Sequence, residues 1–114
     1  MPGVYMSFDS ICYLMTYLVM ASATLLLDEK QVFADGAIVQ MRLWQVPLSV
    51  RGSRHFLKYS LFYGRPGVRL LAYDNEAGKG DHVHRGDVEI KYHFVSVEKL
   101  IADFIGEVQA MRRS

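Results

Sequence analysis

The sequence predicts an α+β fold, in which an antiparallel meander of about five strands is covered by a C-terminal amphipathic helix. Three observations support this prediction. Short segments with apolar residues at every second position follow one another, glycine-containing turns separate them, and the last segment alone repeats its apolar residues at helical spacing. With 114 residues, of which 51% are hydrophobic, the chain has length for one domain with one core.

Turn residues separate the predicted strands. Four strands come first, and they cover residues 24–33, 37–46, 54–63 and 68–73. Asp35-Gly36 favours a tight hairpin turn after the first strand because both residues tolerate positive φ. Pro66-Gly67 suits the turn before the fourth strand, since proline presets φ and glycine supplies the position with positive φ. Consecutive strands joined by short turns predict an antiparallel meander.

The chain ends in one more strand and a helix. The fifth strand begins at His82 or Val88 and ends at Phe94. Ser96 is the predicted N-cap of the helix, because its hydroxyl can accept a hydrogen bond from the first turn. The apolar face of the helix consists of Val97, Leu100, Ile101, Phe104, Ile105, Val108 and Met111. This spacing predicts an amphipathic helix that lies on the sheet.

The N-terminal segment has a different composition. From Ser10 to Leu27 it holds no charged residue, as a membrane span or signal peptide would. The run is at the lower edge of the transmembrane length range, contains four Ser and Thr residues and follows no Lys or Arg, so a membrane location is not favoured. A start at Met20 accounts for it more simply. We therefore predict that residues 1–23 are an extension and that residues 24–114 form a single α+β domain.

Charge and cysteine content exclude several classes of protein. The net charge is +1, so attraction to nucleic acid has to come from a local patch. The single cysteine, Cys12, excludes an internal disulfide framework and a cysteine-based zinc site. It fits a reducing cytoplasm, which is the location that we expect.

The strongest candidate for a site is a glycine-rich segment that gathers acids, cations and two histidines. His82 and His84 point to the same side of an extended chain, because side chains alternate along it. Imidazoles accept or donate protons near pH 7, so the pair suits acid–base cleavage of a phosphodiester. Asp81 would orient one ring, while Lys79 and Arg85 would stabilise the charge that builds on phosphate.

Two alternatives to this chemistry are open. The segment can be a solvated loop whose His and Asp side chains make local turn hydrogen bonds. It can also belong to a metal-dependent hydrolase, since Asp81, His82 and His84 offer ligands that transition metals accept. A further carboxylate would come from Asp74, Glu76 or Asp87. Neighbouring cations oppose a metal, so we predict no metal and no cofactor.

The strands carry further candidate groups. If Arg54 and Lys58 share a face with the loop, they bind a phosphate backbone; otherwise they solvate the outer face of the sheet. Trp44 and most tyrosines are predicted to be core aromatics. Tyr92 lies just past the loop and is a candidate site residue. We assign structural roles to the remaining histidines, His55 and His93.

The string D-N-x-x-G-K-G-D-H-x-H at residues 74–84, preceded by Trp44-Gln45-Val46-Pro47, resembles the TumE family. The resemblance covers residues 24–111. The family's motif residues fall on Asp74, Asn75, Lys79, Asp81, His82 and His84. TumE proteins look like the toxin half of prokaryotic type II toxin-antitoxin modules, so the resemblance implies a helix-turn-helix antitoxin encoded nearby.

Together these observations predict a toxin that acts on RNA as an endoribonuclease. The alternative from another class is a non-enzymatic interaction module, whose sheet or helix binds the antitoxin and whose loop only closes the fold.

Overall fold

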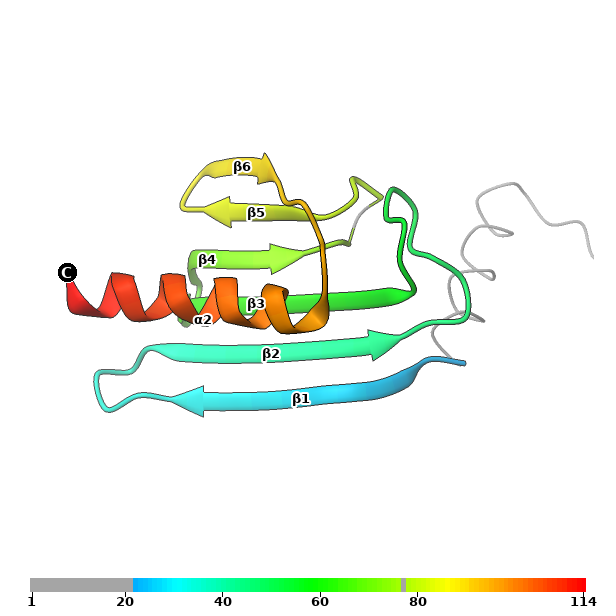
Figure 1. Ribbon diagram of the computed structural model, residues 1–114. Helices are drawn as coiled ribbons and strands as arrows, with labels where there is room; N and C mark the ends of the chain where they lie inside the picture. The colour runs from blue at the N-terminus through cyan, green and yellow to red at the C-terminus, as the bar shows by residue number, and fades with distance from the viewer. Residues whose placement is uncertain (1–21, 77) are drawn as a thin grey trace, which may run out of the picture.

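The structure is a computed structural model that describes residues 22–76 and 78–114. Six strands form one antiparallel sheet in chain order, and one helix lies across it (Figure 1). The elements are β1 (Thr24–Val32), β2 (Ile38–Gln45), β3 (Leu57–Arg65), β4 (Val68–Asp74), β5 (His82–Arg85), β6 (Val88–Lys91) and α2 (Val97–Arg113). The predicted α+β meander with a C-terminal helix is confirmed.

The N-terminal extension that the sequence predicts falls almost entirely on residues 1–21, which lie outside the described residues. Within the described part of the chain, no helix has the length and apolar character needed to cross a membrane.

The structure has one strand more than the sequence predicts. The predicted fifth strand is two short strands, β5 and β6, which pair with each other through Arg85↔Val88 and His82↔Lys91. Gly86 adopts a φ of 61° in the turn between them, a conformation that glycine reaches without steric penalty. The sequence predicts that the fifth strand starts at His82 or Val88. In the structure both residues start a strand, because His82 begins β5 and Val88 begins β6.

The two faces of the sheet differ in what covers them. On β3, Tyr59, Leu61 and Tyr63 are buried, whereas Lys58 and Phe62 on the other face are partly exposed. This alternation follows from the two-residue period of a strand. The buried side chains pack against α2. We call the opposite face, over which no helix or strand of the described residues lies, the open face.

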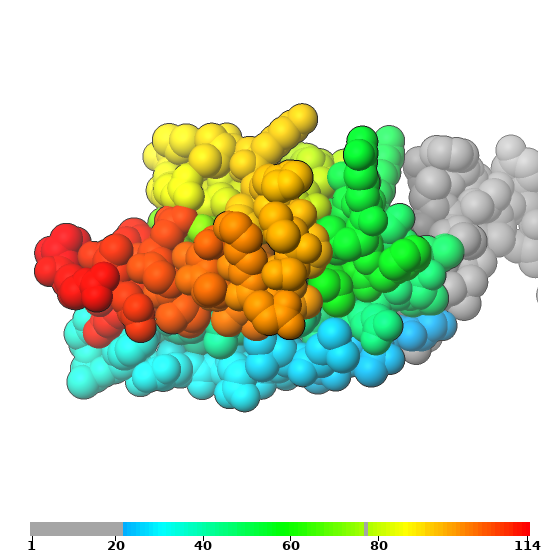
Figure 2. Space-filling view, in the orientation of Figure 1, coloured from blue at the N-terminus to red at the C-terminus, as the bar shows by residue number. Residues whose placement is uncertain are grey.

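The core lies between α2 and the middle of the sheet. In the space-filling view α2 covers the middle of the sheet on this side (Figure 2). Leu100, Phe104 and Val108 are the buried residues of α2, which begins at the predicted N-cap. There the hydroxyl of Ser96 accepts a hydrogen bond from the backbone N–H of Lys99 at 3.1 Å. The strands contribute Val39, Leu43, Tyr59, Leu61, Tyr63, Leu71, Tyr73 and Val83 to the same cluster.

Polar contacts also hold α2 against the sheet. Arg85 of β5 donates two hydrogen bonds to the carboxylate of Glu107, at 2.8 and 2.6 Å. The hydroxyl of Tyr73 donates to the same carboxylate. The bond from Arg85 is the main reason why the pKa of Glu107 lies below its ordinary value. Near the end of the helix, Arg112 donates to the hydroxyl of Tyr63 at 3.2 Å.

Candidate active site on the open face

The candidate site lies where β4 and β5 pair, on the open face of the sheet. In their antiparallel register Asp74 lies opposite His82, and Ala72 lies opposite His84. The two imidazoles therefore stand on the same face, as the sequence predicts, and their ring centroids are 4.7 Å apart. Two histidines and one carboxylate thus converge on a single point.

His82 is held at both ring nitrogens. Its Nδ1 lies 2.8 Å from the carbonyl oxygen of Gly80, and its Nε2 lies 2.8 Å from Oδ1 of Asp74. A carbonyl and an ionised carboxylate both accept hydrogen bonds and donate none, so a doubly protonated ring satisfies both contacts, whereas a neutral ring satisfies one. The side chain of His82 is 6% exposed.

His84 has looser contacts and a different electrostatic environment. Its Nε2 lies 3.9 Å from Oδ2 of Asp74, beyond hydrogen-bond distance. The pKa of His84 is lowered from its ordinary value, first by burial and then by the positive charge of Arg69 and by His82. The two neighbouring histidines therefore have different surroundings. His84 is suited to be neutral and to accept a proton, while both ring nitrogens of His82 face hydrogen-bond acceptors.

The same cluster has the geometry of a metal site. One ligand atom from each of Asp74, His82 and His84 lies within 4.8 Å of the others, and Oε1 of Glu89 lies 4.0 Å from Nε2 of His82. The hydrogen bond from Nδ1 of His82 to the Gly80 carbonyl is the kind of support that metal-binding histidines commonly have. Nitrogen and oxygen ligands of this kind suit a divalent transition metal. The sequence offered Asp74 as one possible further carboxylate, and the structure places it at the centre.

Asp81 and Arg85 lie on the other side of the sheet from the two imidazoles. Neighbouring residues of an extended segment point to opposite faces, so residues 81, 83 and 85 face α2 while 82 and 84 face away. The sequence placed Asp81 beside His82 or His84, but its carboxylate instead lies 2.6 Å from Nε2 of His55. Arg85, predicted to contact phosphate, is bonded to Glu107. The carboxylate that lies beside the paired imidazoles is that of Asp74.

Asp81 belongs to a buried polar network beneath the loops. Its carboxylate accepts hydrogen bonds from the hydroxyls of Ser53 at 2.6 Å and Tyr59 at 2.8 Å, in addition to the His55 contact. Nδ1 of His55 accepts from the backbone N–H of Leu57 at 3.2 Å, so both of its nitrogens have partners within the fold. These contacts fit the structural role that the sequence assigns to His55.

Asn75, another motif residue, joins two parts of the chain. Its side chain is 0% exposed. The side-chain oxygen accepts from the backbone N–H of Tyr59 at 3.0 Å, and the nitrogen donates to the carbonyl of Leu57 at 2.7 Å and to Ser53 at 3.2 Å. The amide therefore fastens the end of β4 to the start of β3 beside the site.

Tyr92 faces the helix. Its hydroxyl donates to Asp103 of α2 at 2.7 Å, and its ring meets that of Tyr73 edge-on with centroids 5.1 Å apart. Burial raises the pKa of Tyr92, and the bond to Asp103 raises it further. These contacts tie β6 to the start of α2, so Tyr92 contributes to the fold on the face opposite the two imidazoles.

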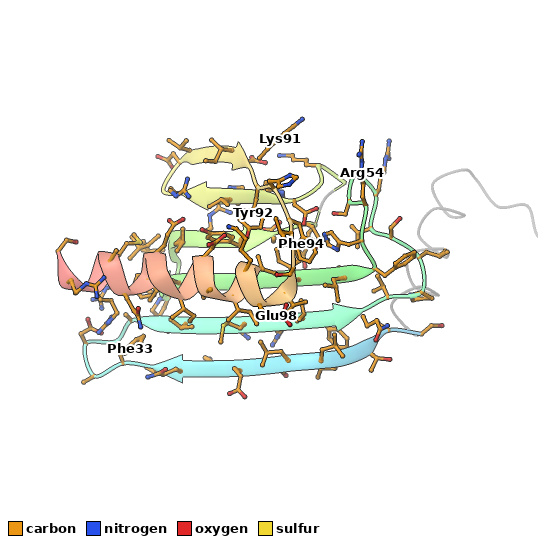
Figure 3. All side chains as sticks on the ribbon, in the orientation of Figure 1. Phe33, Arg54, Lys91, Tyr92, Phe94 and Glu98 are labelled. Carbon is orange, nitrogen blue, oxygen red and sulfur yellow. The ribbon has the colours of Figure 1, made fainter. Side chains whose placement is uncertain are left out.

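The cations predicted to bind phosphate are divided between two places. Arg54 and Lys79 line a cavity of about 300 Å³ where three loops meet at the end of the sheet, together with Lys91. Figure 3 shows Arg54 and Lys91 at this end, both pointing away from the sheet. Lys58 instead projects from the open face of β3, with its Nζ 3.0 Å from Glu76. Arg54 and Lys58 therefore do not contact one ligand together.

This cavity, which Asp81 and Tyr92 also line, lies at the end of the sheet next to residues of the imidazole cluster. Lys91 is the register partner of His82, and the carbonyl of Gly80, which lines the cavity, holds Nδ1 of His82. Nζ of Lys79 lies 3.4 Å from Glu89, the carboxylate nearest His82 after Asp74. Positive charge thus lies on one side of the paired histidines. With the imidazoles, the carboxylate and the cations in place, the local chemistry suits transfer of protons beside a phosphate group.

Comparison with known families agrees with the motif. The family model described as Toxin TumE matches residues 22–112. The chain belongs to the TumE toxin family. No match was found among curated proteins or among solved structures. Membership supports a role as a toxin, and a TumE toxin implies an antitoxin as its partner.

In this TumE toxin several site residues could not be found by the motif alone. Glu89 and Lys91 enter the cluster because β6 pairs with β5, and the only sequence signal for that hairpin is the Gly86 turn. Arg69 acts on His84 from the bulged start of β4. Trp44, predicted to lie in the core, is partly exposed on the open face.

Proposed function

We propose that this TumE toxin cleaves RNA by acid–base catalysis at the paired imidazoles of the open face. His84 is the general base, His82 is the general acid and Asp74 positions the ring of His82. The observation that carries the proposal is the convergence of His82 and His84 on Asp74, in different environments, on the face opposite α2.

The roles follow from the contacts of each ring. The lowered pKa of His84 leaves it neutral near pH 7, which a base requires. His82 faces two acceptors, and when doubly protonated it gives the proton on Nε2 to the leaving oxygen as that oxygen takes the place of Asp74 Oδ1. Pairs of groups whose surroundings favour opposite protonation states are typical of acid–base sites.

The reaction needs no atom beyond those of the RNA. His84 takes the proton of a ribose 2′-hydroxyl, whose oxygen attacks the adjacent phosphorus. The bond from phosphorus to the 5′-oxygen breaks, and His82 gives that oxygen its proton. The products are a 2′,3′-cyclic phosphate and a 5′-hydroxyl. Lys79, whose Nζ lies 3.4 Å from the Glu89 carboxylate beside His82, stabilises the charge on the phosphoryl oxygens.

Defined RNA oligonucleotides test the proposal. Wild-type protein is expected to yield cyclic-phosphate ends from RNA and nothing from the matching DNA, which lacks the attacking hydroxyl. His84→Ala and His82→Ala are each expected to lower the rate about 10²- to 10⁴-fold. Gln109→Ala, at an exposed amide of α2 outside the cluster and the cavity, is the control and should keep the wild-type rate.

Two results would contradict this mechanism. Cleavage that stops in EDTA and returns with added Zn²⁺ or Mn²⁺ would replace it with metal-dependent hydrolysis at the same three residues. Growth arrest in a bacterial host that survives the His82→Ala/His84→Ala double substitution would favour the non-enzymatic interaction module.

The partner that we propose is a helix-turn-helix antitoxin encoded beside the toxin gene. Its support is the toxin family itself, since a free nuclease in its own cell requires a silencing partner. Co-expression of the neighbouring helix-turn-helix protein should abolish growth arrest, and the two proteins should co-purify. Arrest that persists in the presence of that protein at equal levels would refute this choice of partner.

A further inference from the structure

A second hollow, of about 300 Å³, lies on the open face beside the imidazole cluster. Its walls come from β2, β3 and the chain just after β4: Trp44, Phe62, Gln40, Arg42, Lys58 and Glu76. In the register of the two strands Trp44 lies opposite Lys58, Arg42 opposite Ser60, and Gln40 opposite Phe62. Of these three successive cross-strand pairs, the first and the third each contain an aromatic ring, and the middle pair contains the short Ser60 side chain.

The sheet register connects this hollow to the site. Ser60, which lines it, pairs with Asp74, and Asp74 pairs with His82. Neighbouring strands are about 4.8 Å apart, so the hollow begins one strand from the carboxylate that holds the imidazoles. Nothing in the described part of the chain separates the two across the sheet. A single extended ligand can reach both.

Trp44 has a position that core packing does not explain. It alternates with Leu43, which is 3% exposed and belongs to the core, so its indole lies on the open face and is only partly buried. Phe62 lies on the same face for the same reason, between the buried Leu61 and Tyr63. Large aromatic side chains on a solvent-facing surface are the usual platforms for unstacked bases of single-stranded nucleic acid.

The charges of the hollow suit a base better than a phosphate. Lys58 is paired with Glu76 at 3.0 Å, and Arg42 lies 3.4 Å from Asp28. Each cation thus has a carboxylate beside it, in contrast to the cavity at the end of the sheet, where Arg54 and Lys91 have no ion-pair partner among the described residues. Aromatic surface bordered by both donors and acceptors matches a planar, neutral ligand that forms hydrogen bonds at its edge.

We propose that this hollow binds a nucleobase of the RNA, stacked on Trp44, while a phosphate further along the same RNA strand lies at the imidazole cluster, three strands away. The inference rests on the proposed function for the identity of the ligand, and it adds the site that positions the substrate. The RNA then crosses the open face from β2 towards β6, with its base in the hollow and its backbone at the cationic end.

Fluorescence tests this binding site directly, because Trp44 is the only tryptophan in the chain. The probe is a hexanucleotide of 2′-O-methyl RNA, which keeps the bases and lacks the attacking hydroxyl. Titration is expected to change the Trp44 emission and to saturate. The dissociation constant from emission should equal that from the anisotropy of a labelled hexanucleotide.

Substitutions separate stacking from other contacts. Trp44→Ala is expected to weaken hexanucleotide binding about 5- to 150-fold, the range observed for loss of one stacked base. Trp44→Phe keeps an aromatic surface and should recover most of the affinity, which also controls for folding. Phe56→Ala removes an aromatic ring that is 58% exposed outside the hollow and should leave affinity unchanged.

The possible failures are distinguishable. In one outcome, anisotropy reports binding of the hexanucleotide while the Trp44 emission stays constant and Trp44→Ala keeps the wild-type affinity. That result would overturn the hollow as a base site, whatever the cleavage assay shows. Absence of any hexanucleotide binding would overturn it as well. Saturable quenching with no cleavage of natural RNA would support the base site and refute the proposed nuclease.

Discussion

Asn75→Ala tests whether a motif residue next to the site acts through the fold or through chemistry. The amide is 0% exposed and makes three hydrogen bonds, to the N–H of Tyr59, the carbonyl of Leu57 and the hydroxyl of Ser53. None of these partners belongs to the imidazole cluster. Alanine removes all three bonds and leaves two backbone groups without their partner.

The expected loss of stability can be worked out from these contacts. A net value of about 1 kcal/mol for each hydrogen bond gives about 3 kcal/mol in total, and buried backbone groups left unpaired add to this rather than subtract. We therefore expect the free energy of unfolding to fall by about 3–4 kcal/mol. Against a typical domain stability of about 5–15 kcal/mol, the variant should remain folded at low temperature.

Urea unfolding followed by circular dichroism measures this loss. With a slope of about 1–3 kcal/mol per M, the midpoint should fall by about 1–4 M. Gln109→Ala, which truncates an exposed amide on α2, is the control and should change stability by less than about 0.5 kcal/mol. A loss below about 1 kcal/mol for Asn75→Ala would refute the hydrogen-bond argument. A variant of full stability without activity would give Asn75 a catalytic role.

Three further predictions follow from the same contacts. The positive charge of Arg69 helps to hold the pKa of His84 below 6.5, so Arg69→Gln should raise that pKa. Because a general base loses activity as the pH falls through its pKa, the fall in cleavage rate at acid pH should begin at a higher pH in this variant. Gly52→Ala should destabilise more than Gly67→Ala in thermal melts. Both have positive φ, but a Cβ on Gly52 would lie 2.5 Å from a backbone nitrogen, whereas one on Gly67 would meet nothing within 4 Å. Phe104→Ala, at a fully buried ring, should cost about 3–5 kcal/mol in urea unfolding.

For each of these three predictions, a specific result would contradict the physical reason behind it. An unchanged pH profile in Arg69→Gln, or an equal shift in Arg113→Gln at the exposed end of α2, would show that the charge of Arg69 does not act on His84. Equal melting temperatures for the two glycine variants would mean that the loops of Gly52 and Gly80 separate freely. A small effect of Phe104→Ala would mean that α2 is not the cover of the core.

The sequence correctly predicts which face of a strand or helix is buried, but it does not predict which residues of neighbouring strands lie opposite each other. The alternation around Tyr59 and the spacing around Phe104 correctly give the buried faces of β3 and α2, because burial imposes a period on each segment separately. Which residue lies opposite His82 depends on how β4 and β5 align across the loop between them, and no local pattern encodes that alignment. The sequence therefore found both imidazoles but placed Asp81 beside them, whereas Asp81 contacts His55 and the carboxylate next to His82 is that of Asp74.

Alternation along β3 has a consequence for how the protein tolerates change. Tyr59, Leu61 and Tyr63 support the core, while Lys58, Ser60 and Phe62 lie on the face that we assign to the substrate. A saturation scan of this strand should separate its positions into two interleaved sets. Substitutions at odd-numbered positions should lower the abundance of the protein in the cell. Substitutions at even-numbered positions should lower its toxicity at normal abundance. Some cells will survive expression of the toxin while still accumulating full-length protein. The toxin variants in those cells should carry their substitutions at the even-numbered positions of β3, while the core residues of the same strand stay unchanged.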